Sequence, residues 1–107
     1  MKVIKEICTR YDLKLIEDAA HALSSQYQGE LIGNLGDITC FSFYATKNIT
    51  CGEGGAVATN NKKLAEKIRL QRLHGMNLTA QDRATDGYRH WDMIVMGWKY
   101  NMSNLDA

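Results

Sequence analysis

Apolar and polar positions repeat along this chain with two different periods. Residues 2–12 place apolar side chains at helical spacing, which predicts a short amphipathic helix. Residues 13–18 predict a buried strand that ends in two carboxylates, and residues 38–45 alternate between two faces, as a strand does. Residues 54–59 predict a further short strand. Strands interspersed with helices in this way indicate an α/β fold.

The second half of the chain begins with the clearest helix pattern. Residues 61–74 carry apolar side chains on one face, Asn60 is placed to cap the helix, and Gly75 is placed to end it. Residues 76–90 are polar and aperiodic, which predicts a long loop that is mobile or depends on a neighbouring subunit. Glycines within residues 27–37 predict a small hairpin or loop.

The end of the chain suggests that it is part of something larger. Ser103 is placed like the cap of a helix that has barely begun at Ala107. The predicted strands also require a larger sheet than these segments supply. We therefore expect the chain to be a piece of a longer protein.

Length, charge and cysteine content narrow the class of function. A chain of 107 residues allows one domain at most, and a net charge of +1 gives no electrostatic case for a nucleic-acid or membrane partner. No apolar run approaches the roughly 18 residues of a membrane span, and the charged start is unlike a signal peptide, so a cytoplasmic location is the default. Three cysteines without paired spacing suggest reduced thiols and no metal site.

Two charged residues follow the two strongest strand patterns. Asp18 ends the first, at the edge where open α/β sheets hold their ligands, although a helix cap or a solvated acid is an equally open alternative. Lys47 follows the second at the corresponding position. An amine that is desolvated or lies beside another cation becomes a nucleophile toward aldehydes, whereas a surface turn would explain this lysine without any chemistry.

Other candidates are weaker when taken singly. Ser42 lies five residues before Lys47, where its hydroxyl could hold a phosphate oxygen or bond to backbone. His21 could project with Asp18 if residues 19–25 form a helical turn, but a lone histidine is more often structural. The glycine-rich run CGEGG matches neither a dinucleotide fingerprint nor a Walker motif.

Together these residues resemble a known family. The segment IEDAAHALSSQYQGELIGNLGDITCFSFYATKNITCGEGGAVATNN is similar to the core of the DegT/DnrJ/EryC1/StrS family of pyridoxal-phosphate (PLP) sugar aminotransferases. The likeness continues through LHG at 73–75 to the final GWKYNMSNLDA, and EDAAHA, FSFxxxK, GEGGA and GxKYNMS in this order are specific. The resemblance implies that residues 1–107 are a fragment of the PLP-binding large domain of a type I, aspartate aminotransferase-like transferase. The small C-terminal domain would then be absent.

The resemblance also assigns roles to individual residues. Lys47 corresponds to the catalytic lysine that condenses with the cofactor aldehyde and later moves the proton. Asp18 corresponds to the partner of the pyridine nitrogen, which it keeps protonated so that the ring accepts electrons. His21 would lie beside the ring and Ser42 would bind the phosphate. Asn101 would reach the phosphate from the partner subunit, which implies a homodimer with a shared site.

The implied reaction transfers an amino group from an amino acid, usually glutamate, to a keto group of a nucleotide-linked sugar. The ATKNITCGEGG and GWKYNMS segments look closest to the branch that acts at C4, in the biosynthesis of bacterial cell-surface polysaccharides or related amino sugars. One alternative is a PLP-dependent sugar dehydratase, but those relatives carry histidine in place of Lys47. Another is a regulatory member or an inactive fragment, and we expect these 107 residues alone to be inactive. We also expect Asp18 and Lys47 to converge on one cavity close to Ser42.

Overall fold

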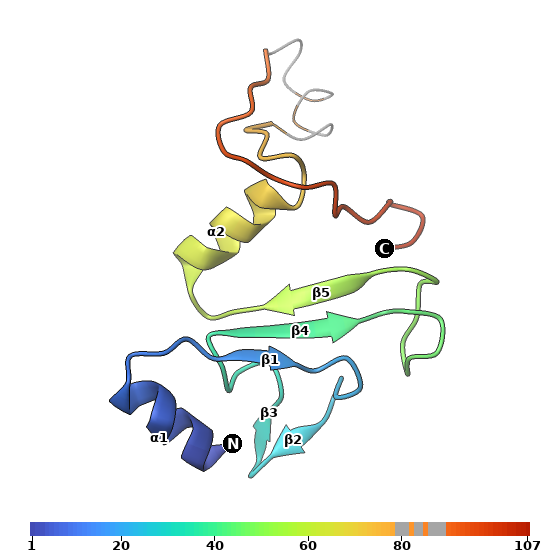
Figure 1. The fold of residues 1–107 in the computed structure, drawn as a ribbon. Helices are drawn as coiled ribbons and strands as arrows, with labels where there is room; N and C mark the ends of the chain where they lie inside the picture. Colours follow the sequence, from blue (N-terminus) through green and yellow to red (C-terminus); the bar gives the residue numbers. More distant parts are fainter. Residues whose placement is uncertain (79–81, 83–84, 86–89) are drawn as a thin grey trace. The chain divides into compact units, whose positions relative to one another are not determined.

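The computed structural model describes residues 1–78, 82, 85 and 90–107 (Figure 1). These residues form two compact units, one made of residues 1–62 with 102–107 and the other of residues 63–101. The remaining residues of the predicted loop at 76–90 lie outside the described part, and so does the expectation about its mobility.

The first unit is built around a three-stranded sheet with the order β1-β4-β5. Its strands are β1 (Ile16–Asp18), β4 (Ile38–Ser42) and β5 (Gly55–Ala58). β1 runs parallel to β4, and β5 runs antiparallel to it. α1 (Lys2–Arg10) precedes the sheet, and a hairpin of β2 (Gln26–Tyr27) and β3 (Glu30–Leu31) lies in the chain between β1 and β4 (Figure 1). The parallel β1–β4 pair brings the carboxyl ends of two strands to one edge of the sheet.

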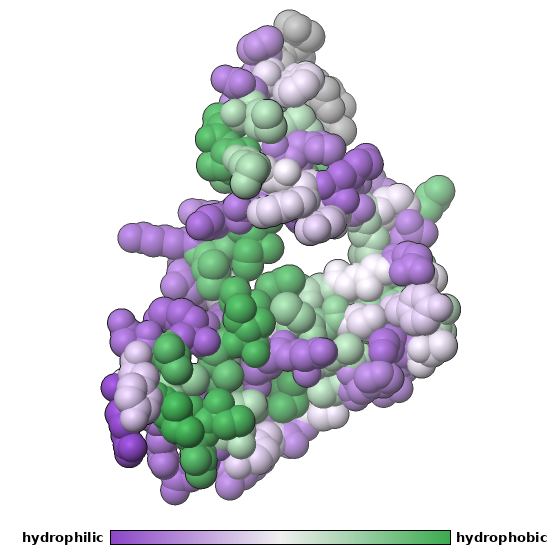
Figure 2. All heavy atoms as spheres, viewed as in Figure 1, coloured by the Kyte–Doolittle hydropathy of each residue, from purple (hydrophilic) through white to green (hydrophobic). Residues whose placement is uncertain are grey.

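The apolar stripe predicted for α1 is present but remains at the surface. No residue of α1 is buried, and Val3 and Ile7 are 65% and 43% exposed. Figure 2 shows apolar side chains at the surface in this part of the molecule. Periodicity therefore identified the helix correctly, although it ends at Arg10 rather than at residue 12.

The strand predicted at residues 13–18 is shorter than expected, and the side chain that it buries is polar. Only Ile16–Asp18 forms a strand, and Ile16 is 64% exposed. The side chains buried between β1 and β4 are instead polar, because Glu17 and its register partner Thr39 occupy the covered face. The expectation of a buried strand is therefore wrong for one face of β1, since its own residue pattern does not say which face is covered.

The connection between β1 and β4 contains turns and the expected hairpin. Residues 19–25 form turns rather than a helix, with the N–H of Ala22 donating to the carbonyl of Ala19 (2.9 Å). In the hairpin, Gln28 and Gly29 both have positive φ, as a two-residue turn of the I′ type requires. The glycine pattern thus predicted the correct element here.

The second unit starts within α2 (Lys62–Gln71). This helix begins one residue later and ends three residues earlier than predicted. Gly75 has a φ of 72°, and its N–H donates to the carbonyl of Leu70 (2.9 Å), so it closes the helix as expected. The LHG segment pairs with GWKYN through a bridge between Leu73 and Lys99. Two segments that the family resemblance singled out are therefore neighbours in this unit.

Other expectations concern single residues and longer segments. The thiols of Cys8, Cys40 and Cys51 are free, as predicted. Ser103 Oγ accepts the N–H groups of Leu105 and Asp106 (3.2 Å each), in the manner of a helix cap, although the residues that follow form a turn. Within the described residues, no helix has the length and apolar character needed to cross a membrane.

Candidate active site at the carboxyl ends of β1 and β4

Asp18 and Ser42 share one face of the sheet. Asp18 is paired in register with Cys40, and parallel neighbours in register point to the same side. Ser42 lies two residues further along β4, so its side chain returns to that face, roughly 7 Å along the strand direction. The opposite face carries Glu17 and Thr39. The parallel pairing therefore places a carboxylate and a hydroxyl at the same edge, as the sequence predicted.

The segments that leave these two strands bring Lys47 to His21. The Nζ of Lys47 lies 2.7 Å from the Nε2 of His21, which is hydrogen-bonding distance. Lys47 is half-buried and His21 is exposed. The amine can donate to a neutral ring nitrogen, or the ring can donate to an uncharged amine. His21, which follows β1, and Lys47, which follows β4, are thus in direct contact.

Local hydrogen bonds orient the Asp18 and Ser42 side chains. The Oδ1 of Asp18 accepts the N–H of Ala20 at 3.1 Å, so the cap-like bond that the sequence left open is present. The Oγ of Ser42 accepts the N–H of Tyr44 at 3.2 Å, where the chain turns away from β4. Asp18 remains exposed, so its carboxylate can still accept a donor from a ligand.

The loop that carries Lys47 is tied at its base. The N–H of Phe43 donates to the carbonyl of Gly54 (2.8 Å), while the Phe43 carbonyl accepts from the Cys51 N–H (3.1 Å) and the Thr50 hydroxyl (3.0 Å). At Gly55 an added Cβ would lie 2.6 Å from the carbonyl oxygen of Phe41, so no larger residue fits without a backbone shift. The glycine run GEGG therefore lets β5 approach β4 closely just behind the lysine loop.

Asn101 belongs to the second unit, where it is exposed. Asp18, His21, Ser42 and Lys47 all belong to the first unit. The structure therefore gathers these four residues at one sheet edge of a single unit, and Asn101 is not among them.

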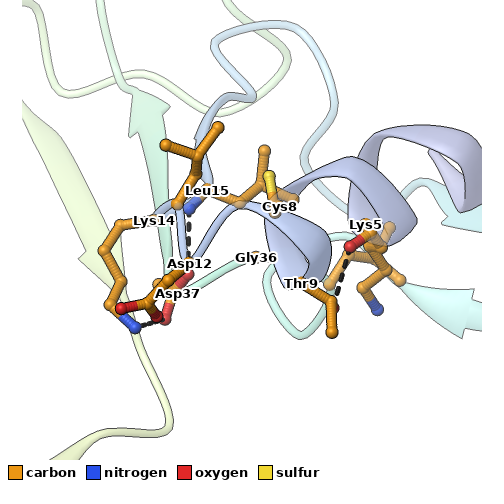
Figure 3. Close-up of a pocket in the computed structure, with 10 residues that line it drawn as sticks. Lys5, Cys8, Thr9, Asp12, Lys14, Leu15, Gly36 and Asp37 are labelled. Carbon is orange, nitrogen blue, oxygen red and sulfur yellow. Dashed lines mark hydrogen bonds and ion pairs between the residues drawn. The ribbon is translucent and has the colours of Figure 1, made fainter.

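A hollow of about 410 Å³ lies at the other end of the two strands (Figure 3). It is lined by residues such as Cys8 of α1, Leu15 just before β1 and Asp37 just before β4. None of Asp18, His21, Ser42 and Lys47 lines it, so it is not the cavity expected close to Ser42. The described residues also contain no cluster of three or more His, Cys, Asp or Glu side chains that could hold a metal ion.

The sequence interpretation missed Glu17 as a part of this region. Its carboxylate is 7% exposed, and its Oε2 accepts the hydroxyl of Thr39 (2.7 Å) and the N–H of Gly36 (2.9 Å). The available signal was an acid directly before Asp18 within a predicted buried strand. Strand alternation places such a residue on the face opposite Asp18, where a buried carboxylate needs donors.

Comparison with known proteins identifies what this arrangement resembles. The chain is 43% identical, over its whole length, to the spore coat polysaccharide biosynthesis protein SpsC of Bacillus subtilis. The structure of Helicobacter pylori PseC, an aminotransferase involved in the biosynthesis of pseudoaminic acid, matches 98% of the chain with a TM-score of 0.85 and 31% identity. The structure of DesI in the presence of its TDP-sugar product matches 70% of the chain with a TM-score of 0.67 and 41% identity.

These matches cover only part of each relative. The chain spans 28% of the length of SpsC, 26% of PseC and 19% of DesI. They confirm the predicted fold class, a mixed α/β part of a type I PLP-dependent transferase. The model of the DegT/DnrJ/EryC1/StrS aminotransferase family matches residues 1–107. The chain therefore belongs to the DegT/DnrJ/EryC1/StrS aminotransferase family.

Proposed function

We propose that these residues form part of a PLP-dependent aminotransferase that transfers an amino group from an amino acid to a keto group of a nucleotide-linked sugar. The observation that carries the proposal is the 2.7 Å contact between Lys47 Nζ and His21 Nε2 at the edge where Asp18 and Ser42 lie. This edge is where open α/β sheets bind their ligands. Membership of an aminotransferase family supports the reaction class.

The residues at this edge fit the cofactor on which the family depends. An amine, a carboxylate and a hydroxyl match the aldehyde, the ring nitrogen and the phosphate of PLP. When bound, PLP supplies an electron sink for the carbon that loses or gains the amino group. Neutral Lys47 would hold the aldehyde covalently and, once released, would carry the proton to and from the reacting carbon.

The other residues would bind and orient. Asp18 would accept a hydrogen bond from the protonated ring nitrogen, and the Ser42 hydroxyl would donate one to a phosphate oxygen. His21 would hold the Lys47 amine and border the ring. Asn101 would complete the phosphate site of a second subunit in a homodimer, as the family resemblance implies.

The named relatives support a substrate class. PseC is an aminotransferase involved in the biosynthesis of pseudoaminic acid, SpsC is a spore coat polysaccharide biosynthesis protein, and the DesI structure was determined in the presence of its TDP-sugar product. We infer a nucleotide-linked keto sugar, aminated at C4 with glutamate as donor, in the cytoplasmic biosynthesis of amino sugars for surface polysaccharides. The presence of Lys47 favours transamination over the dehydratase alternative, because the family relatives that dehydrate carry histidine there.

Covalent trapping on the full-length protein tests the proposal. Borohydride added after PLP should fix the cofactor at Lys47, where peptide mass analysis should find it. Lys47→Ala should lose the label and the transfer of nitrogen from glutamate together, because one amine serves as anchor and as proton carrier. Lys63→Ala is the matched control, since Lys63 is exposed and lies in α2, outside β1 and β4. Labelling at another lysine, or near-normal turnover in Lys47→Ala, would refute the assignment.

A further inference from the structure

Two acidic side chains hold the beginning of β1 against the beginning of β4. Glu17 Oε2, on β1, accepts the N–H of Gly36 just before β4 (2.9 Å). Asp37 Oδ2, also just before β4, accepts the N–H of Leu15 just before β1 (2.9 Å), a bond drawn in Figure 3. The β1 segment and the β4 segment thus each supply a carboxylate that accepts a hydrogen bond from a backbone N–H of the other. We call Glu17 and Asp37 the acidic clamp.

Glu17 is the buried half of the clamp. It is 7% exposed, and besides Gly36 its Oε2 binds the hydroxyl of Thr39, which is fully buried. A carboxylate is costly to bury unless donors satisfy it, and hydrogen bonds to a charged acceptor are stronger than neutral ones. An added Cβ at Gly36 would lie 2.9 Å from the Leu15 carbonyl oxygen and 3.1 Å from Glu17 Oε2. The backbone at residue 36 therefore lies so close to this carboxylate that only glycine fits there.

The clamp matters because β1 is very short. Its three residues pair with β4 from Ile16 opposite Ile38 to Asp18 opposite Cys40. Backbone bonds between the two segments extend only from Leu15, whose carbonyl accepts the N–H groups of Asp37 and Ile38, to Ala19. So short a pairing specifies register weakly, whereas a slip of one residue would turn Asp18 to the opposite face. A slip of two residues would keep the face but move the carboxylate roughly 7 Å along the strand. Side-chain bonds at the strand start are well placed to prevent either slip.

We propose that Glu17 is a positioning residue, which through Gly36 and Thr39 sets the β1–β4 register and thereby places Asp18 at the cofactor site. The role of Asp18 rests on the proposed function, whereas the effect on register does not. Glu17 itself lies on the face opposite Asp18 and touches no proposed cofactor atom. Its influence is therefore transmitted through the backbone of β1.

The experiment compares graded variants in the full-length protein. Glu17→Ala removes the acceptor and Glu17→Gln keeps an oxygen at the same reach. Thr39→Val removes the hydroxyl donor and Thr39→Ser keeps it. Ile68→Ala, in α2, is the control for general destabilisation, because it lies outside β1 and β4. Two quantities are measured below the unfolding temperature: PLP affinity from the absorbance of the bound cofactor, and hydrogen exchange in a peptide that contains Ala19.

Ala19 is a direct reporter of register, because its N–H donates to the carbonyl of Cys40 (2.8 Å) next to Asp18. In Glu17→Ala we expect exchange at this peptide to accelerate and PLP affinity to fall, each by about tenfold or more, because two hydrogen bonds to a charged group are lost. Thr39→Val should follow in the same direction. Glu17→Gln and Thr39→Ser should stay within about threefold of the wild type, since the bonds can re-form.

The possible outcomes distinguish an effect on the β1–β4 register from a general loss of stability. Unchanged exchange and affinity in Glu17→Ala would overturn the proposal. So would losses in Glu17→Ala no larger than those in Ile68→Ala at an equal drop in melting temperature. If the wild type does not retain PLP, the proposed function fails, while the exchange at Ala19 still decides whether Glu17 sets the register.

Discussion

The contact between Lys47 and His21 leads to a specific prediction about the rate at which the lysine captures PLP. Replacing His21 with leucine removes the ring nitrogen that lies 2.7 Å from Lys47 Nζ, while a side chain of comparable bulk remains. The amine then loses the partner that holds it at the sheet edge. We expect the full-length variant to capture PLP covalently more slowly than the wild type, because a free lysine side chain samples many rotamers.

The size of the effect follows from the exposure of the pair. A hydrogen bond that involves a charged group contributes about 1.5–3 kcal/mol when it is well shielded from solvent. His21 is exposed and Lys47 is only half-buried, so about 1 kcal/mol is the appropriate scale. That corresponds to a roughly fivefold slower capture. His21→Gln should stay within about twofold, since its amide oxygen can accept from the amine.

Stopped-flow absorbance after PLP is mixed with the cofactor-free protein measures this rate. Lys63→Ala serves as the control, because Lys63 is exposed in α2, outside β1 and β4, and its loss should leave the rate unchanged. Capture at the wild-type rate in His21→Leu would show that the contact does not hold the lysine. Equal slowing in His21→Gln and His21→Leu would show that hydrogen bonding is not the cause.

Two other substitutions test the site and its support. Asp18→Asn should lower PLP affinity by about tenfold but turnover by on the order of a hundredfold, since the amide no longer stabilises a protonated ring nitrogen; steady-state assays against bound-cofactor absorbance would show the split. Gly55→Ala should lower the free energy of unfolding by about 2 kcal/mol or more in denaturant titrations, because its Cβ would meet the Phe41 carbonyl at 2.6 Å. Gly52→Ala, with open space but a φ of 85°, should cost about 1 kcal/mol. Equal losses at the two glycines would contradict the steric explanation.

Local features of this protein could be predicted from its sequence because they depend on near neighbours along the chain. Apolar spacing identified α1 and α2, and alternation identified β4 with Ser42 and Thr39 on opposite faces. The positive-φ pair that closes the hairpin at Gly29 is likewise a property of a few adjacent residues. Motif order was sufficient for the family, since four short segments in sequence are more specific than any one of them.

The tertiary structure alone decided which of these residues meet. Glu17 and Thr39 are 22 residues apart, and Lys47 and His21 are 26 apart, so neither contact is visible in a local pattern. The sequence suggested that β1 is buried, but Ile16 is exposed and only the acid beside it is buried, because burial is set by what packs on each face. Register is a property of two strands together. The composition of β1 determined that Asp18 ends a strand, and only its pairing with β4 determined that this carboxylate shares a face with Ser42.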